Sequence, residues 1–414
     1  MRCKSRQTLT NGSLVRRIAL AGVVTLTALL GSVLPASAAT SPEPGTATAN
    51  GGFFSLLGST VSCGSPTTCL AVGSNLNNKS GSITPSAEAW NGKAWRSVTV
   101  PRPKGAELTI VASVSCKSAT SCLVVGSYDT PGENGSELPY ALSWNGAALR
   151  PTAALPAPKG GGLVSFNGVS CVSVKSCVAI GSQVGGGLPL VVETWNGAKW
   201  ALRTARGLAG SAFTDVSAVS CRSVTSCVIA GESYSTTGSP SMLLARWNGK
   251  GFTAMKAAAP AGGKNILLNA VSCTSATSCV AAGLSANSAG TAGFGFTELW
   301  NGKSWTPDKV AVPRGDSISY LFGVSCVTSR NCIAVGGVGT AKSGRGSALA
   351  YNGKTWSALK VPAPAKGKSS SFSGVSCPKA ADCVAIGQTG ASGGTSPTPL
   401  SGLWNGSSWR LVAA

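Results

Sequence analysis

The sequence predicts an all-β fold built from seven copies of one four-stranded unit. A Val-Ser-Cys triplet recurs every 50 to 55 residues, and a second cysteine follows six residues after the first in every copy. Each copy then carries an aromatic residue followed by Asn-Gly, and a second bulky residue stands five positions beyond that aromatic. Such a period implies one supersecondary unit whose faces are buried only against neighbouring units.

The first 39 residues have the pattern of a secretory signal peptide. Five lysines and arginines accompany an apolar run over residues 18–34, and small residues follow at 36–38. We expect cleavage near Ala38, a linker over residues 40–52, and no transmembrane segment in the mature chain. An uncleaved membrane anchor is the alternative.

The mature chain holds fourteen cysteines, two per copy, and an even count in an exported protein favours disulfides. Zinc is disfavoured because the chain has no histidine, so we predict no metal and no cofactor. Each bridge would close a small ring worth roughly 2.4 kcal/mol. The predicted pairs are Cys63–Cys69, Cys116–Cys122, Cys171–Cys177, Cys221–Cys227, Cys273–Cys279, Cys326–Cys332 and Cys377–Cys383.

Each copy divides into four strands, A to D. Apolar stretches such as residues 110–112 predict strand A, and residues 177–181 with their counterparts predict strand B. The aromatic before Asn-Gly ends strand C, and the second bulky residue begins strand D. We expect a two-residue type I′ turn that pairs Trp90 with Lys93 and Glu88 with Trp95. Both tryptophans would then project from one face and pack on the next unit.

Seven such units fit a seven-bladed β-propeller over residues 53–414, with four antiparallel strands and one A–B hairpin disulfide per blade. An open solenoid of hairpins is the alternative, but it would expose sheet edges. No strongly permuted strand is evident to close the ring: either residues 46–48 add a short strand, or blade 7 simply packs on blade 1. The A–B tips and C–D turns then share one face, the turn face. The variable B–C loops and the D–A passages share the other, the loop face.

The repeat Cys-x5-Cys-x-Ala-x-Gly followed by Trp-Asn-Gly-x-x-Trp resembles that of secreted bacterial β-propellers related to the kelch and galactose-oxidase-central-domain group. The resemblance covers residues 53–414. Kelch repeats place a glycine pair after the second strand, then tyrosine and tryptophan, and Gly336-Gly337, Tyr351 and Trp356 come closest to that pattern. The resemblance implies the fold. It does not imply the copper chemistry of galactose oxidases, because that centre uses histidines and this chain has none.

The charge balance is strongly basic, at +21 for the whole chain. Outside the cell this favours anionic partners such as acidic polysaccharides, wall polymers or phospholipid headgroups; a role in solubility alone is the alternative. A protein partner is also compatible with a propeller surface. No nucleic-acid recognition motif is present. We predict a monomer that is secreted, extracellular or associated with the cell wall.

Candidate binding residues are expected on the loop face. Tyr128 with Asp129, and Glu232 with Tyr234, place an aromatic beside an acid, which suits the apolar face and hydroxyls of a sugar ring. Basic residues recur in the D–A passages and could hold an anion, although lysines also lie at the opposite turns. The predicted basic binding residues are Arg102, Lys104, Lys159, Arg206, Lys264, Arg314 and Lys366.

Three glutamates, Glu88, Glu193 and Glu298, share one position in strand C of blades 1, 3 and 5. Paired carboxylates can perform acid/base work on glycosidic bonds. These three would lie at least two blades apart, so we expect salt bridges to lysine or arginine instead.

Together these patterns predict an exported, non-catalytic binding module for cell-wall or extracellular polysaccharide or for a protein partner. No catalytic residue is assigned, because histidine, a serine elbow and a phosphate loop are all absent from the sequence. A glycan-active hydrolase or lyase, with acids converging over the channel mouth, is the first alternative. A purely structural surface protein is the second.

Overall fold

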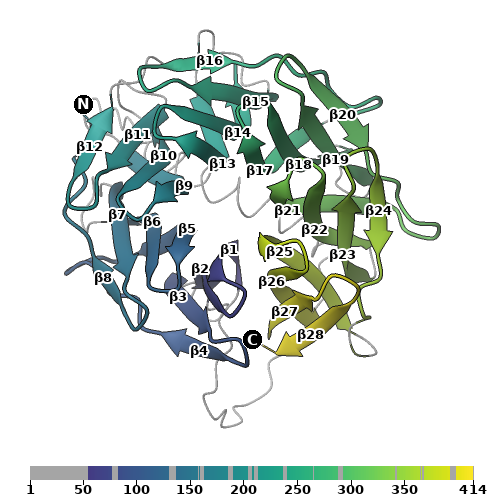
Figure 1. Ribbon diagram of the computed structural model, residues 1–414, viewed down its shortest axis with the longest axis horizontal. Coiled ribbons are helices and arrows are strands. Elements are labelled where there is room, and N and C mark those ends of the chain that lie inside the picture. The colour runs from purple at the N-terminus through teal and green to yellow at the C-terminus, as the bar shows by residue number, and fades with distance from the viewer. Residues whose placement is uncertain are drawn as a thin grey trace, which may run out of the picture.

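Four-stranded antiparallel units, arranged around a central opening, make up the computed structural model (Figure 1). All regular elements of the described residues are strands, 28 in number, and they fit the predicted seven blades. The predicted signal peptide and linker lie outside the described residues. The described residues are 55–76, 83–129, 137–156, 158, 163–184, 190–203, 208, 213–235, 240–263, 265–287, 292–340, 343–363, 365, 368–391 and 398–413.

The innermost strand of each blade, A, is followed outward by B, C and D. The A strands are β1 (Ser55–Ser65), β5 (Thr109–Ser118), β9 (Leu163–Ser173), β13 (Phe213–Ser223), β17 (Ile266–Ser275), β21 (Ile318–Thr328) and β25 (Lys368–Lys379). The B strands are β2 (Thr68–Leu76), β6 (Ser121–Asp129), β10 (Ser176–Val184), β14 (Ser226–Tyr234), β18 (Ser278–Ala286), β22 (Asn331–Gly339) and β26 (Asp382–Ala391).

The two outer strands complete each blade. The C strands are β3 (Ile83–Trp90), β7 (Glu137–Trp144), β11 (Leu190–Trp195), β15 (Pro240–Trp247), β19 (Gly293–Trp300), β23 (Gly344–Tyr351) and β27 (Thr398–Trp404). The D strands are β4 (Trp95–Val98), β8 (Leu149–Pro151), β12 (Trp200–Arg203), β16 (Phe252–Ala254), β20 (Trp305–Lys309), β24 (Trp356–Leu359) and β28 (Trp409–Ala413). A single parallel pair between Gly293 and Ile318 links blades 5 and 6.

The Val-Ser-Cys triplet serves two purposes in each blade. All seven predicted disulfides are confirmed, each joining an A strand to its B strand. The serine hydroxyl accepts a hydrogen bond from the cysteine N–H of the following blade, as between Ser62 and Cys116 at 2.9 Å. The same bond recurs at every junction, and Cys63 donates to Ser376 at 3.0 Å to close the ring. These repeated bonds explain the invariant serine.

A one-residue β-bulge interrupts each A strand of blades 2 to 7, four residues before its first cysteine. The bulge brings a carbonyl oxygen of strand A over the glycine that follows the second cysteine. A Cβ on Gly126 would lie 1.9 Å from the oxygen of Ile110, and one on Gly231 would lie 2.1 Å from that of Asp215. The repeat therefore requires glycine at this position.

The Asn-Gly connection is longer than the predicted two-residue turn. Trp90 pairs directly with Trp95, and Glu88 pairs with Ser97, so the loop has four residues. The Asn91 side-chain oxygen accepts hydrogen bonds from the N–H groups of residues 93 and 94, both at 2.9 Å, and stabilises this wider loop. The expected pairs Trp90–Lys93 and Glu88–Trp95 are therefore wrong. The two tryptophans are opposite each other, with ring centroids 5.5 Å apart.

The aromatic row of each blade packs on the preceding blade, not on the next one. Trp90 shares a buried cluster with Val384 and Ile386 of blade 7. The indole N–H of Trp95 donates to Ser401, also in blade 7, at 2.9 Å. The same contacts join blades 3 and 2, and the junction of blades 7 and 1 involves no exchanged strand among the described residues. Blade 7 thus packs directly on blade 1, and residues 46–48 lie outside the described residues.

Candidate functional site

The loop-face end of blade 4 brings together two acids, of which only Glu232 was predicted from the sequence. Asp215 on β13 is the direct cross-strand partner of Glu232 on β14. The Tyr234 hydroxyl donates to Glu232 Oε2 at 2.6 Å. Asn167 of blade 3 donates its amide N–H to Asp215 Oδ1 at 3.3 Å. The predicted pairing of Glu232 with Tyr234 therefore occurs, because residues two apart in a strand share a face.

Burial raises the pKa values of both acids in this pair. It raises the pKa of Glu232 to about 7; the hydrogen bond from Tyr234 lowers that pKa, and the charge of Asp215 raises it. Burial also raises the pKa of Asp215. Burial and the contact with Glu232 raise the pKa of Tyr234, so its hydroxyl stays protonated as a donor. The pair can therefore hold a proton near neutral pH.

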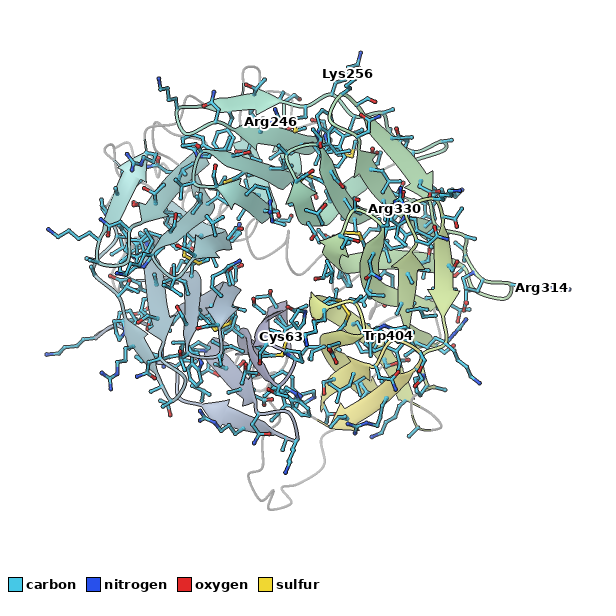
Figure 2. All side chains as sticks on the ribbon, viewed as in Figure 1. Cys63, Arg246, Lys256, Arg314, Arg330 and Trp404 are labelled. Carbon is cyan, nitrogen blue, oxygen red and sulfur yellow. A yellow bond between two sulfur atoms is a disulfide. The ribbon has the colours of Figure 1, made fainter. Side chains whose placement is uncertain are left out.

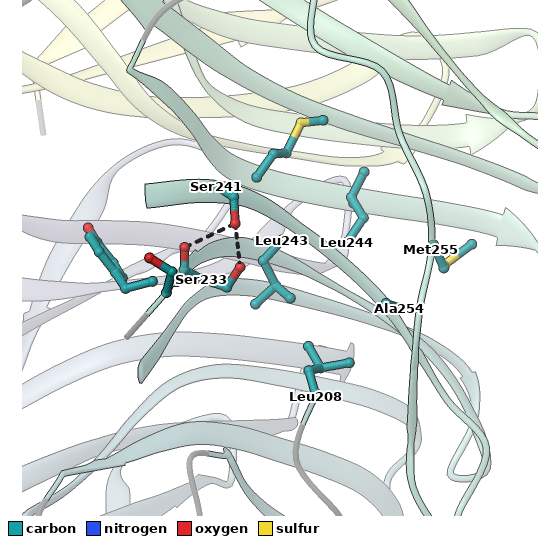
Figure 3. Close-up of a pocket in the computed structure, with 10 residues that line it drawn as sticks. Leu208, Ser233, Ser241, Leu243, Leu244, Ala254 and Met255 are labelled. Atoms are coloured by element: carbon teal, nitrogen blue, oxygen red, sulfur yellow. Dashed lines mark hydrogen bonds between the residues drawn. The ribbon is translucent and has the colours of Figure 1, made fainter. Parts of the chain in front are cut away.

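A pocket of about 250 Å³ lies at the same end of blade 4 and has Tyr234 in its lining (Figure 3). Leu208 and Leu243 form apolar walls, while Ser233 and Ser241 hydrogen-bond to each other at 2.8 Å. Neither acid lines the pocket, and Tyr234 connects the two through its hydrogen bond to Glu232. We call the pocket together with Asp215 and Glu232 the blade-4 site. The residues that line the pocket are Leu208, Ser233, Tyr234, Ser235, Ser241, Met242, Leu243, Leu244, Ala254 and Met255.

The sequence did not single out Asp215, although the signal was present. Asp215 lies six residues before Cys221, and the paired cysteines fix the register of the hairpin. Counting outward from the disulfide without a bulge pairs Asp215 with Ser233. The bulge at residue 217 shifts the register by one and sets Asp215 opposite Glu232.

The second predicted aromatic–acid pair is not brought together. Tyr128 packs on Tyr140, with ring centroids 6.1 Å apart, against the core between blades 1 and 2. Asp129 follows Tyr128 in the same strand and so projects from the opposite face. A different acid, Glu137, accepts hydrogen bonds from Ser127, at 2.6 Å, and from Ser165 of blade 3. Glu137 thus links two blades through serine hydroxyls.

The predicted basic residues that fall within the described part of the chain do not converge. The Arg102 guanidinium donates hydrogen bonds to the carbonyls of Ala106 and Glu107, both at 3.1 Å. These bonds stabilise the D–A passage to which Arg102 belongs. Lys104 is exposed. Arg314 is exposed and lies at the outer rim of the ring (Figure 2). Four more predictions lie outside the described residues: Lys159, Arg206, Lys264 and Lys366.

The expected salt bridges of the strand-C glutamates are absent from the described part of the chain. Glu193 and Glu298 are fully buried between blades, and none of their carboxyl oxygens has a hydrogen-bond partner. Glu88 is also buried, with Oε2 unpartnered. Burial raises the pKa of Glu88 to about 7 and those of the other two to about 8. The prediction was wrong because these side chains lie on the same face as the tryptophans, which packs on the preceding blade; Arg203 influences Glu193 electrostatically but forms no ion pair with it.

The described residues contain no group of three or more histidine, cysteine, aspartate or glutamate side chains that could hold a metal ion. They also contain no helix that is long and apolar enough to cross a membrane.

No protein-family model and no curated protein matches this chain. Solved β-propellers do match. YCF48 bound to a D1 peptide has 14% identity and a TM-score of 0.50, covering 85% of this chain and 95% of that one. A PL25 ulvan lyase bound to -[GlcA(1-4)Rha3S]- has 10% identity and a TM-score of 0.53, covering 86% and 96%. The SapL1 lectin in complex with alpha methyl fucoside has 13% identity and a TM-score of 0.40, covering 71% and 92%. At these identities the similarity shows the propeller fold alone, and the kelch relationship stays a prediction.

Proposed function

We propose that this chain is an exported, non-catalytic binding module that takes a sugar residue of an extracellular or cell-wall polysaccharide in the blade-4 site. The observation that supports this proposal is the composition of the pocket. Apolar walls such as Leu243 adjoin serine hydroxyls and a tyrosine. A sugar ring offers an apolar face and several hydroxyls, so it matches both kinds of surface.

Export is supported by two separate features. Seven disulfides are typical of proteins that fold in an oxidising compartment. The sequence of residues 1–39 has the pattern of a cleaved signal peptide. A secreted, monomeric protein of residues 40–414 is therefore the proposed mature form.

A pocket-filling variant tests the binding proposal. Ala254 lines the pocket and is exposed, so Ala254→Trp should block the site without disturbing the core. Ala258→Trp, at an exposed position outside the pocket lining, is the matched control. In a screen of glycans and wall polymers, a ligand should bind the wild type and the control and be lost from Ala254→Trp. Equal binding by all three proteins would place the ligand elsewhere.

Failure to bind any polymer would remove the carbohydrate proposal. Capture of a specific protein in that case would favour the protein-partner alternative. If neither a polymer nor a protein were bound, a purely structural surface role would remain.

A glycan-active enzyme is the second candidate, and the acid pair is the observation that favours it. Glu232, with a pKa near 7, could donate a proton to a leaving oxygen, and Asp215 beside it would be the second carboxyl of the pair. Against a lyase, the raised pKa of Tyr234 disfavours its use as a base. Release of reducing ends from a polysaccharide, abolished in Glu232→Gln while binding persists, would establish catalysis.

A further inference from the structure

The turn face has the same local arrangement in every blade. In each blade the A–B tip touches the C–D turn of the same blade. A Cβ built on Gly92 of a turn would lie 3.0 Å from the Thr67 side chain of the tip, and one on Gly197 would lie 2.7 Å from Lys175. The same contact recurs in the other five blades. Side chains from tips and turns therefore present a shared surface to solvent.

This surface is almost uniformly cationic. The C–D turns carry Lys93, Lys199, Lys250, Lys303 and Lys354, and all five are exposed. The A–B tips carry Lys117, Lys175, Arg222, Arg330 and Lys379, which are exposed as well. The tips and turns, all within the described residues, contain one carboxylate, Asp382. None of the ten cations forms an ion pair within the described chain.

Two of these cations lie on innermost strands and interact electrostatically. Lys117 and Arg222 each follow the first cysteine of an innermost strand, in blades 2 and 4 respectively. Figure 1 shows both strands, β5 and β13, beside the central opening. Partial burial lowers the pKa of Lys117, and the charge of Arg222 lowers it further. An anion placed between the two would relieve this repulsion.

The loop face has a different balance of positive and negative charge. Its described residues include Glu137, Asp215 and Glu232 among the cations. One of its arginines, Arg345, is paired with Asp316 at 2.7 Å. Among the described residues, positive charge is therefore less compensated on the turn face than on the loop face.

A polymer fits this surface better than a membrane does. Among the described residues the one exposed large hydrophobic side chain is Val174, which is 49% exposed. Membrane-surface proteins usually add a set of apolar side chains that enter the lipid, and a single valine does not supply one. A chain of regularly spaced anions can instead contact cations from successive blades.

We propose that the turn face binds an acidic polysaccharide, with Lys117 and Arg222 at its centre and the turn lysines around them. This extends the proposed binding role to a second surface, on the opposite side of the ring from the blade-4 site. The two sites fail or succeed independently, because they share no residue.

Neutralisation of matched sets of charges tests the turn-face proposal. The face variant is Lys117→Gln, Lys175→Gln and Arg222→Gln. The control is Lys256→Gln, Lys360→Gln and Lys368→Gln, which removes the same charge from exposed positions outside the turn face. The probes are immobilised polygalacturonate, neutral dextran, and mixed phosphatidylglycerol and phosphatidylcholine vesicles, each at low and high salt.

The wild type and the control should bind polygalacturonate at low salt and release it at high salt. The face variant should bind it at least about tenfold more weakly. An equal loss in both variants would show that net charge alone is responsible and overturn the proposal. Preference for the vesicles over polygalacturonate would overturn it in favour of a lipid surface. Ala254→Trp should bind polygalacturonate as the wild type does, which separates this result from the blade-4 site.

Discussion

Replacing Glu193 with leucine should make the protein more stable at alkaline pH. Blades 2 and 6 already have leucine at this position, at Leu142 and Leu349, so the substitution copies the protein's own repeat. Glu193 is fully buried, and neither of its carboxyl oxygens has a hydrogen-bond partner. Burial raises its pKa to about 8, and the charge of Arg203 offsets part of the rise.

The sign of the effect follows from proton binding. Between pH 4.5, the ordinary value for the group, and about 8 the folded protein keeps the Glu193 proton, while the unfolded chain releases it. The folded state therefore binds more protons, and stability falls as pH rises through this window. The loss is at most about 3 kcal/mol at neutral pH and about 5 kcal/mol above the folded pKa. Leucine has no proton to lose and avoids this penalty.

Guanidinium unfolding at pH 5 and pH 8, followed by tryptophan fluorescence with the disulfides intact, measures the difference. We expect Glu193→Leu and the wild type to differ little at pH 5. At pH 8 the variant should be more stable by about 1–4 kcal/mol. The exposed Glu107→Gln is the control and should follow the wild type. If the variant loses as much stability as the wild type between the two pH values, the reasoning is refuted.

Two further predictions concern single hydrogen bonds. Ser170→Ala removes the acceptor of the Cys221 N–H, now at 2.9 Å, and should lower the free energy of unfolding by about 1–2 kcal/mol; an unchanged denaturant midpoint would show that the ring of serine bonds adds nothing. Tyr234→Phe removes the donor to Glu232 and should raise the pKa of that carboxyl above about 7. Carbon NMR titration of labelled glutamate measures it, and a lower value would contradict the assigned contact.

The repeat made the ring predictable because every copy has the same six-residue separation of its cysteines and the same Asn-Gly after its aromatic residue. Cysteines six residues apart fix one hairpin, and the aromatic before Asn-Gly fixes the end of another. What the pattern could not show was the loop geometry. Asn91 caps a four-residue loop with its own side chain, and the choice between that loop and a two-residue turn depends on side-chain hydrogen bonds.

The site was less predictable for a related reason. Glu232 and Tyr234 are two residues apart in one strand, so their contact follows from alternation alone. Asp215 reaches them only through a hairpin register that a bulge shifts by one. That tips and turns share one face followed from strand alternation, and the structure adds that each tip contacts the turn of its own blade.

The bond between Cys63 and Ser376 makes the junction of the first and last blades equivalent to the other six. Each blade is one unbroken stretch of chain, and the additional strand pair between blades 5 and 6 does not involve this junction. A circular permutant opened in the passage between blades 3 and 4, with the original ends joined by a linker, should therefore assemble the same ring. The chain could therefore begin and end at another passage between blades without the loss of any contact between blades.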